Sequence, residues 1–171
     1  MTHEHAFRVA QATDNHVPTV ETDHYIPVLI HWLDTALRAA PPVYVRVSGL
    51  ADGELEFTID PHTGKLLRAI VLSLGAIAIE APPRYPEVPV DEGCGLVIDR
   101  GLWAHSKEHV ISLEWLLRFY RLPAGVRIDV AGIEQARLVE CGPKVTIGLG
   151  ADGTLASIAA RIDIDDHHFQ T

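Results

Sequence analysis

The chain has 171 residues, of which 47 % are hydrophobic and 22 % charged, so it is long enough for one domain with a real core and is not of the disordered class. Its formal net charge of −9 at pH 7 opposes contact with phosphate backbones, which excludes nucleic-acid binding as the main activity. The longest apolar run, residues 70–79, is too short to cross a bilayer.

The first 22 residues are polar without a sustained hydrophobic period, and they predict an N-terminal arm. No basic region followed by an apolar core is visible among them, so we expect no secretory signal. Residues 23–171 are predicted to form one domain. Its first segment, 25–40, carries apolar residues at spacings of three and four, which predicts a helix that begins near His24 or Tyr25, has Pro27 in its first turn and stops at Pro41.

A three-stranded antiparallel meander is predicted next. Asp52-Gly53 supplies the positive φ angles of a tight hairpin, and Thr63-Gly64 closes a longer one. Apolar and polar residues alternate in the first two strands, which indicates a sheet with one buried and one solvated face. The predicted strands are Val43–Ser48, Glu54–Asp60 and Lys65–Leu74, and Ala76–Glu80 is compatible with a fourth.

Four prolines mark residues 81–93 as an extended connector within the domain. A short strand at Gly95–Asp99 and a helix from Ser112 to Arg121 are expected after it. The chain closes with strand-like segments at 126–130, 135–141, 144–149 and 155–164. The sequence therefore predicts an α+β fold, in which an antiparallel sheet made of the meander and a C-terminal hairpin is packed by two or three helices.

Two cysteines, Cys94 and Cys141, lie far apart in the sequence without a pairing motif. This usage predicts two reduced thiols in a cytoplasmic protein. Phosphate-binding, dinucleotide-binding and nucleophile-elbow glycine motifs are also missing from the sequence. We therefore expect a protein that is not an enzyme and needs no cofactor.

One segment matches a catalytic pattern. His105, Glu108 and His109 fit H-x-x-E-H, in which two histidines one helical turn apart bind zinc and the glutamate acts as a base. Such a site needs a third ligand from a further helix, and neither Glu114 nor Glu134 lies in a convincing one. A small metal-dependent hydrolase is therefore the alternative hypothesis. A small-molecule binder in a cleft between sheet and helix is a third class, which no motif supports.

In size, acidity and its strand–Asp-Gly–strand ending VTIGLGADGTLASI (145–158), the chain resembles the small cytoplasmic immunity proteins that bacteria pair with secreted toxins. The resemblance implies tight binding to a basic toxin domain and blockade of its active site. It assigns no functional residue.

Charge placement predicts where such a partner binds. Acidic residues that alternate with the buried positions of strand 54–60 are expected on the solvated face of the sheet, bordered by the acidic connector. Two tyrosines are expected to rim this surface and to act as anchors. The predicted acidic face consists of Tyr44, Glu54, Glu56, Asp60, Tyr85, Glu87, Asp91 and Glu92.

Overall fold

The computed structural model describes residues 7–13, 16–23, 25–32, 40–50, 52–75, 77–78, 81–84 and 87–162. These residues form strands, turns and one short 3-10 turn, and no α-helix occurs in these ranges. No helix within them is long and apolar enough to span a membrane. The elements are β1 Val9–Thr13, β2 Thr19–Glu21, β3 Val28–His31, β4 Val43–Gly49, β5 Glu54–Ile59, β6 Leu66–Ser73, β7 Ile77–Ala78, β8 Val90–Glu92, β9 Gly95–Ile98, η3 Arg100–Leu102, β10 Val110–Trp115, β11 Leu117–Leu122, β12 Gly125–Val130, β13 Arg137–Cys141, β14 Val145–Leu149 and β15 Leu155–Arg161.

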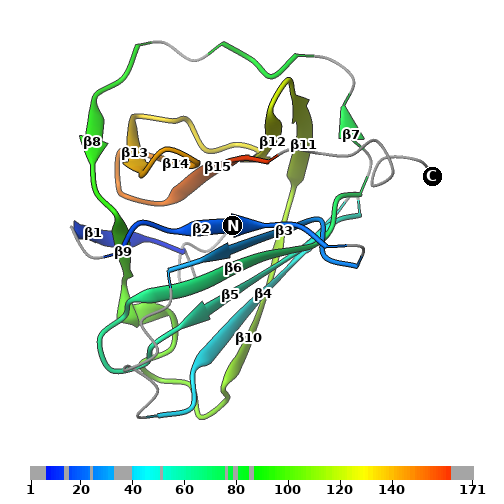
Figure 1. Cartoon of the computed structure of the whole chain (residues 1–171). Helices are drawn as coiled ribbons and strands as arrows, with labels where there is room; N and C mark the ends of the chain where they lie inside the picture. The colour runs from blue at the N-terminus through cyan, green and yellow to red at the C-terminus, as the bar shows by residue number, and fades with distance from the viewer. Residues whose placement is uncertain are drawn as a thin grey trace.

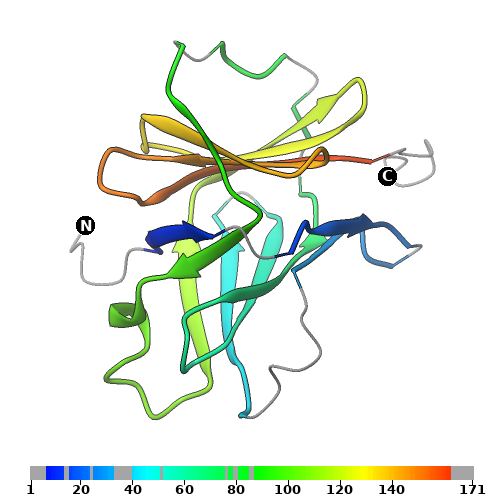
Figure 2. The same cartoon turned by 60° about the vertical axis from the view of Figure 1, so that its left-hand side comes forward.

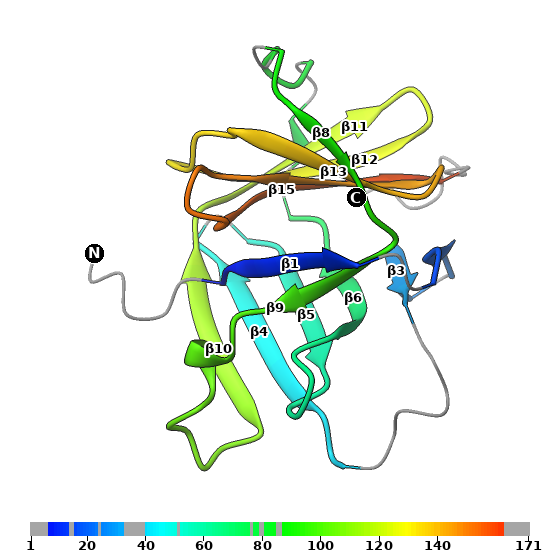
Figure 3. The same ribbon diagram turned by 90° about the vertical axis from the view of Figure 1, so that its left-hand side faces the viewer.

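Two large sheets pack face to face and enclose one hydrophobic core (Figure 1). The six-stranded sheet has the order β10-β4-β5-β6-β3-β2, and the seven-stranded sheet has the order β7-β11-β12-β15-β14-β13-β8. Phe57 of the first sheet and Phe119 and Ile147 of the second belong to the same core cluster. Strands β1 and β9 form a small sheet beside them (Figure 3). The architecture is a β-sandwich.

The predicted meander is confirmed. Strands β4, β5 and β6 are antiparallel neighbours, joined at the turns that the glycines marked. Asp52 and Gly53 both have positive φ angles, 67° and 93°, and Gly64 has φ 74°. The four C-terminal strands are confirmed as well, as β12 to β15 of the seven-stranded sheet.

The helix predicted over 25–40 is wrong where the structure describes it. Residues 28–31 form β3, which pairs with β2 on one side and with β6 on the other. Val28 and Ile30 are buried, so this segment has period two rather than 3.6. Residues 33–39 of the predicted helix lie outside the described residues.

The helix predicted from Ser112 to Arg121 is also wrong, because the segment forms β10 and β11. The chain leaves the six-stranded sheet at Leu116 and enters the seven-stranded one (Figure 1). Leu116 is exposed, and it supplied the helix-like spacing that misled the prediction. The residues that contribute to the core across both strands alternate strictly, namely Ile111, Leu113, Trp115, Leu117 and Phe119. The protein is therefore all-β, and the α+β prediction is wrong.

Within the predicted N-terminal arm, the described residues 7–13 and 16–22 contribute strands to two sheets. Strand β1 pairs antiparallel with β9, and β2 forms an edge of the six-stranded sheet. The buried ring of Phe7 lies 4.5 Å, centroid to centroid, from that of Phe57. The polar residues of this segment give no strand signal in the sequence. An edge strand forms its backbone hydrogen bonds whatever its side chains are, and it needs few apolar ones.

The proline-rich connector joins the two outermost strands of one sheet. Strand β7 runs parallel to β11 at one edge of the seven-stranded sheet, and β8 runs parallel to β13 at the other. The described parts of the connector, 81–84 and 87–89, lie on the side of this sheet that faces away from the core (Figures 1 and 2). We call the chain between β7 and β8 the strap.

Candidate functional site

The residues of the predicted acidic face that lie on the six-stranded sheet do not form an acidic surface. Tyr44 is half-buried on β4, and Glu54 is exposed at the start of β5. Glu56 is only 8 % exposed, and its Oε2 accepts a hydrogen bond of 2.9 Å from Nε of Arg46. Asp60 is only 6 % exposed. The solvated position expected for Glu56 and Asp60 is therefore wrong, because neighbouring strands and the following turn cover them.

Asp60 instead stabilises the turn between β5 and β6. Its carboxylate accepts hydrogen bonds of 2.9 Å from the backbone N–H of His62 and from the hydroxyl of Thr63. Burial alone would raise the pKa of Asp60, but these hydrogen bonds and the nearby His62 hold it below its ordinary value. Asp60 therefore has a structural role.

The connector residues of the predicted acidic face lie on the other sheet. Tyr85 lies outside the described residues. Glu87 belongs to the strap, and Asp91 and Glu92 belong to β8. Asp91 forms an ion pair of 3.7 Å with Arg137. The structure thus separates Glu54 from the connector carboxylates, instead of gathering them on one face.

A smaller acidic group does form along the β8 edge. Glu92 stands directly opposite Glu140 in the register of β8 and β13, and both side chains are exposed. Val90, on the same strand, is 49 % exposed. We call Val90, Glu92 and Glu140 the acidic edge.

The outer side of β8 also presents backbone hydrogen-bonding groups. The N–H of Leu138 donates to the carbonyl of Pro89, and the N–H of Gly93 donates to the carbonyl of Glu140. Hydrogen-bonding sides alternate along a strand, so residues 90 and 92 direct their N–H and C=O groups away from β13. Among the described residues β8 pairs with β13 alone. The acidic edge therefore combines negative charge, apolar surface and an open strand edge.

The H-x-x-E-H segment does not adopt the geometry that its chemistry requires. Residues 105–109 form an exposed stretch of turns and bends between η3 and β10. The N–H of Glu108 donates a hydrogen bond of 3.1 Å to the Ser106 hydroxyl, which bends the backbone there. His105 and His109 are therefore not one helical turn apart on a shared face. Across the described ranges, no group of three His, Cys, Asp or Glu side chains is placed to hold a metal ion.

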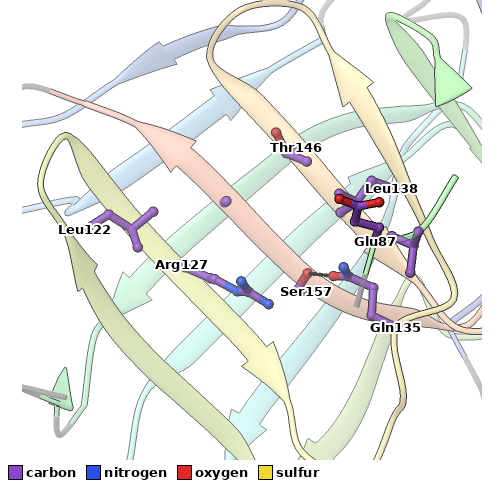
Figure 4. A pocket seen from close by; sticks show the side chains of 9 residues that line it. Glu87, Leu122, Arg127, Gln135, Leu138, Thr146 and Ser157 are labelled. Atoms are coloured by element: carbon purple, nitrogen blue, oxygen red, sulfur yellow. Dashed lines mark hydrogen bonds between the residues drawn. The ribbon is translucent and has the colours of Figure 1, made fainter. Parts of the chain in front are cut away.

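A cavity of about 560 Å³ lies between the strap and the outward face of the seven-stranded sheet (Figure 4). Its volume is within the range of roughly 300–1,000 Å³ typical of small-molecule sites. Strap residues form one side of it, and strands β11 to β15 with the β12–β13 connection form the rest. It is lined by Glu87, Val88, Leu122, Arg127, Gln135, Leu138, Thr146, Ser157 and Ala159.

Polar side chains are held in fixed positions at this cavity. Arg127 Nε donates a hydrogen bond of 2.7 Å to Asp129 Oδ1. The Ser157 hydroxyl donates one of 2.9 Å to Oε1 of Gln135, whose side chain is buried. Gly148 leaves room for this pair, because a Cβ there would come within 3.0 Å of both oxygens.

Of the residues that line the cavity, only Glu87 was singled out from the sequence, and it was expected on the acidic face rather than in a pocket. The available signal was the alternation within the predicted strand 126–130, where Arg127 and Asp129 interrupt a run of core residues. An arginine and an aspartate two positions apart on one strand share a face, which indicates an ion pair on the side away from the core. Gln135 and Ser157 carry no comparable signal, because only the fold brings them together.

The two cysteines are free thiols, and they differ in environment. Cys94 is partly exposed and Cys141 is buried. Burial, with a smaller effect from the nearby Cys94, raises the pKa of the Cys141 thiol to about 12. Cys141 is therefore not an activated nucleophile.

Comparison with known proteins assigns the chain to no family: no protein-family model matches it, and no curated protein matches it.

Proposed function

We propose that this protein is a non-enzymatic, cytoplasmic binding protein that recognises a basic protein partner through the acidic edge. The observation that carries this proposal is the pairing in register of two exposed side chains, Glu92 on β8 and Glu140 on β13. Like charges directly opposite each other destabilise a sheet. Within the described part of the chain no cation forms an ion pair with either carboxylate. A cationic partner would relieve this repulsion on binding.

The size of the repulsion follows from strand spacing. Adjacent strands are about 4.8 Å apart, so two exposed carboxylates about 6 Å apart in water repel by about 0.7 kcal/mol, and physiological salt roughly halves this value. The cost is small for the free protein. It becomes a gain when a lysine or arginine of a partner stands between the two groups.

The open edge of β8 defines the manner of binding. An extended segment of the partner adds to β8, bonding to the outward backbone groups of residues 90 and 92. Val90 offers apolar contact at the same place. The acidity of the whole chain speeds the encounter with a basic partner. In this respect the protein acts as the immunity proteins it resembles do, by covering a toxin domain.

The test compares two double charge reversals of equal net charge. The Glu92→Lys, Glu140→Lys variant alters the acidic edge, whereas Glu54→Lys, Glu114→Lys alters exposed residues of the six-stranded sheet. Each immobilised protein is presented to a native lysate of the producing organism. The wild type and the control variant should capture the same basic protein, and the edge variant should lose it.

Binding kinetics with the captured partner complete the test. Rising salt should slow association with the wild type more steeply than with the edge variant. Equal capture by both variants would move the site elsewhere on the surface. Capture of no basic protein by the wild type would reject the proposed function itself.

A further inference from the structure

The cavity under the strap is a preformed pocket rather than a gap between irregular loops. Its floor consists of small residues on the outward face of adjacent strands, because Ala159 pairs in register with Thr146 and Ser157 pairs with Gly148. Larger side chains from flanking strands stand beside this floor, with Leu122 on one side (Figure 4). Small residues between larger ones leave a recess on a sheet face that would otherwise be flat.

Hydrogen-bond donors gather at one part of this pocket. Gln135 is only 4 % exposed, and its Oε1 is already occupied by the Ser157 hydroxyl. That bond fixes the orientation of the amide, which leaves Nε2 as the group that Gln135 offers to the cavity. Arg127, oriented by Asp129, extends toward Ser157 (Figure 4). Thr146 adds a hydroxyl to the same lining.

Apolar side chains line the remainder of the pocket. Leu122, Leu138 and Val88 border the cavity, and Ala159 belongs to its floor. A ligand that fits therefore has an apolar body and a head that accepts several hydrogen bonds. A carboxylate accepts the most bonds for its size and matches both an amide N–H₂ and a guanidinium.

We propose that the pocket between the strap and the outward face of the seven-stranded sheet binds a small organic carboxylate with an apolar body. The carboxylate lies against Gln135 and Arg127. The body lies over Ala159, between Leu122 and Leu138. This site is independent of the acidic edge and of the partner proposed above.

Glu87 makes the proposal sharper, because its carboxylate lines the same pocket and is exposed. It repels an anionic head and would attract a cationic one. If the ligand is a carboxylate, the Glu87→Gln substitution should strengthen binding about two- to threefold at low salt, which is the size expected of a screened, exposed charge. If the ligand is an amine, the same substitution should weaken binding.

Three probes separate the head from the body. Octanoate carries both features, acetate carries the head alone, and octylamine carries the body with the opposite charge. Each is titrated at millimolar concentration into the full-length ¹⁵N-labelled protein. Octanoate should shift the resonances of the Gln135 side-chain amide and of the Thr146 and Ala159 backbone. Acetate and octylamine should bind at least tenfold more weakly.

Variants then locate the site. Gln135→Met removes the amide donors, and Ala159→Phe fills the floor from the outward face. Both should weaken octanoate binding at least tenfold. Ser112→Phe, which adds the same ring to an exposed position of β10, is the matched control and should bind octanoate as the wild type does.

The outcomes decide the matter. Undiminished octanoate binding by Ala159→Phe, or shifts confined to residues outside the pocket, would overturn the proposed site. Tighter binding of octylamine than of octanoate would overturn the proposed head group, and no detectable octanoate binding would overturn the proposal entirely. The probe comparison on the wild type gives these last two results even if a pocket variant does not fold.

Discussion

Replacement of Gly148 by alanine is expected to destabilise the protein through one buried hydrogen bond. A Cβ at this position would lie within 3.0 Å of both Oε1 of Gln135 and Oγ of Ser157, closer than real Cβ atoms approach. To restore an ordinary contact of 3.4 Å or more, both oxygens must move, and because Gln135 and Ser157 are buried we expect this movement to break their 2.9 Å hydrogen bond. Overpacking costs about 1–3 kcal/mol, and a buried polar group left without its partner costs about 1–3 kcal/mol.

Because the two effects share a cause, we expect Gly148→Ala to lower the free energy of unfolding by about 2–4 kcal/mol. For a chain of this length the melting temperature should fall by roughly 5–15 °C. Urea denaturation of the wild type and the variant measures the difference directly. Gly101→Ala is the matched control: its nearest neighbour is the end of the Asp99 side chain at 3.2 Å, so it should cost less than about 0.5 kcal/mol.

A second substitution tests the mechanism. Ser157→Ala removes one of the two oxygens that the new methyl group meets, so its cost and that of Gly148→Ala should not add. The double variant should be more stable than the sum of the single costs predicts, by about 0.5–3 kcal/mol. Strict additivity, or a Gly148→Ala cost below about 0.5 kcal/mol, would refute the idea that this glycine reserves space for the hydrogen-bonded pair.

Four further predictions concern three side chains, those of Cys141, Glu56 and Asp60. Cys141 should resist a thiol reagent at pH 8 while the partly exposed Cys94 reacts, and both should react in denaturant; two fast native thiols would contradict the burial of Cys141. Burial raises the folded-state pKa of Cys141 from 9.0 to about 12. The free energy of unfolding should therefore fall by roughly 1.4 kcal/mol per pH unit as pH rises through this interval. The Cys141→Ala variant is the control, and the fall in the wild type should exceed any fall seen in this variant by that amount. Glu56→Gln should lower the free energy of unfolding, measured in urea, by about 1 kcal/mol, because it weakens a 2.9 Å ion pair with an exposed Arg46. An unchanged free energy of unfolding would mean that this ion pair does not stabilise the protein. Asp60→Asn should destabilise at neutral pH and progressively less as pH falls through the lowered folded-state pKa of Asp60, which acid titration of both proteins would show; a constant difference would exclude the carboxylate as the cause.

The turn residues were the most reliable guide to the fold in the sequence. Asp52-Gly53 and Gly64 adopt the left-handed conformations that few other residues tolerate, so the hairpins on either side of β5 could be placed from local rules alone. Where a strand changes sheet, local rules failed. The inward residues from Ile111 to Phe119 follow period two without interruption, but the extra apolar Leu116 at the crossing point produced a helical spacing as well.

Side-chain environment was harder to predict than strand position. Alternation correctly placed Leu55 and Phe57 in the core, but the polar Glu56 between them is not exposed to solvent. Glu56 lies on a central strand with Arg46 opposite it on β4 and Ile70 opposite it on β6, so its neighbours cover it. The cavity depends on Gln135 and Ser157, which are 22 positions apart in sequence. Only tertiary structure brings such residues together.

The strap also sets a length for part of the chain. From β7 at one edge to β8 at the other there are six strand spacings, or about 29 Å at about 4.8 Å each. Ala78 and Val90 are twelve residue steps apart, and a proline-rich segment spans about 3.1 Å per step, or about 37 Å. The slack of about 8 Å corresponds to fewer than three residues, part of which is needed to rise over the sheet face. The length of the strap is therefore matched to the width of the sheet. The strap tolerates substitutions and insertions. A deletion of three residues would pull β7 or β8 out of register and expose an unpaired strand edge.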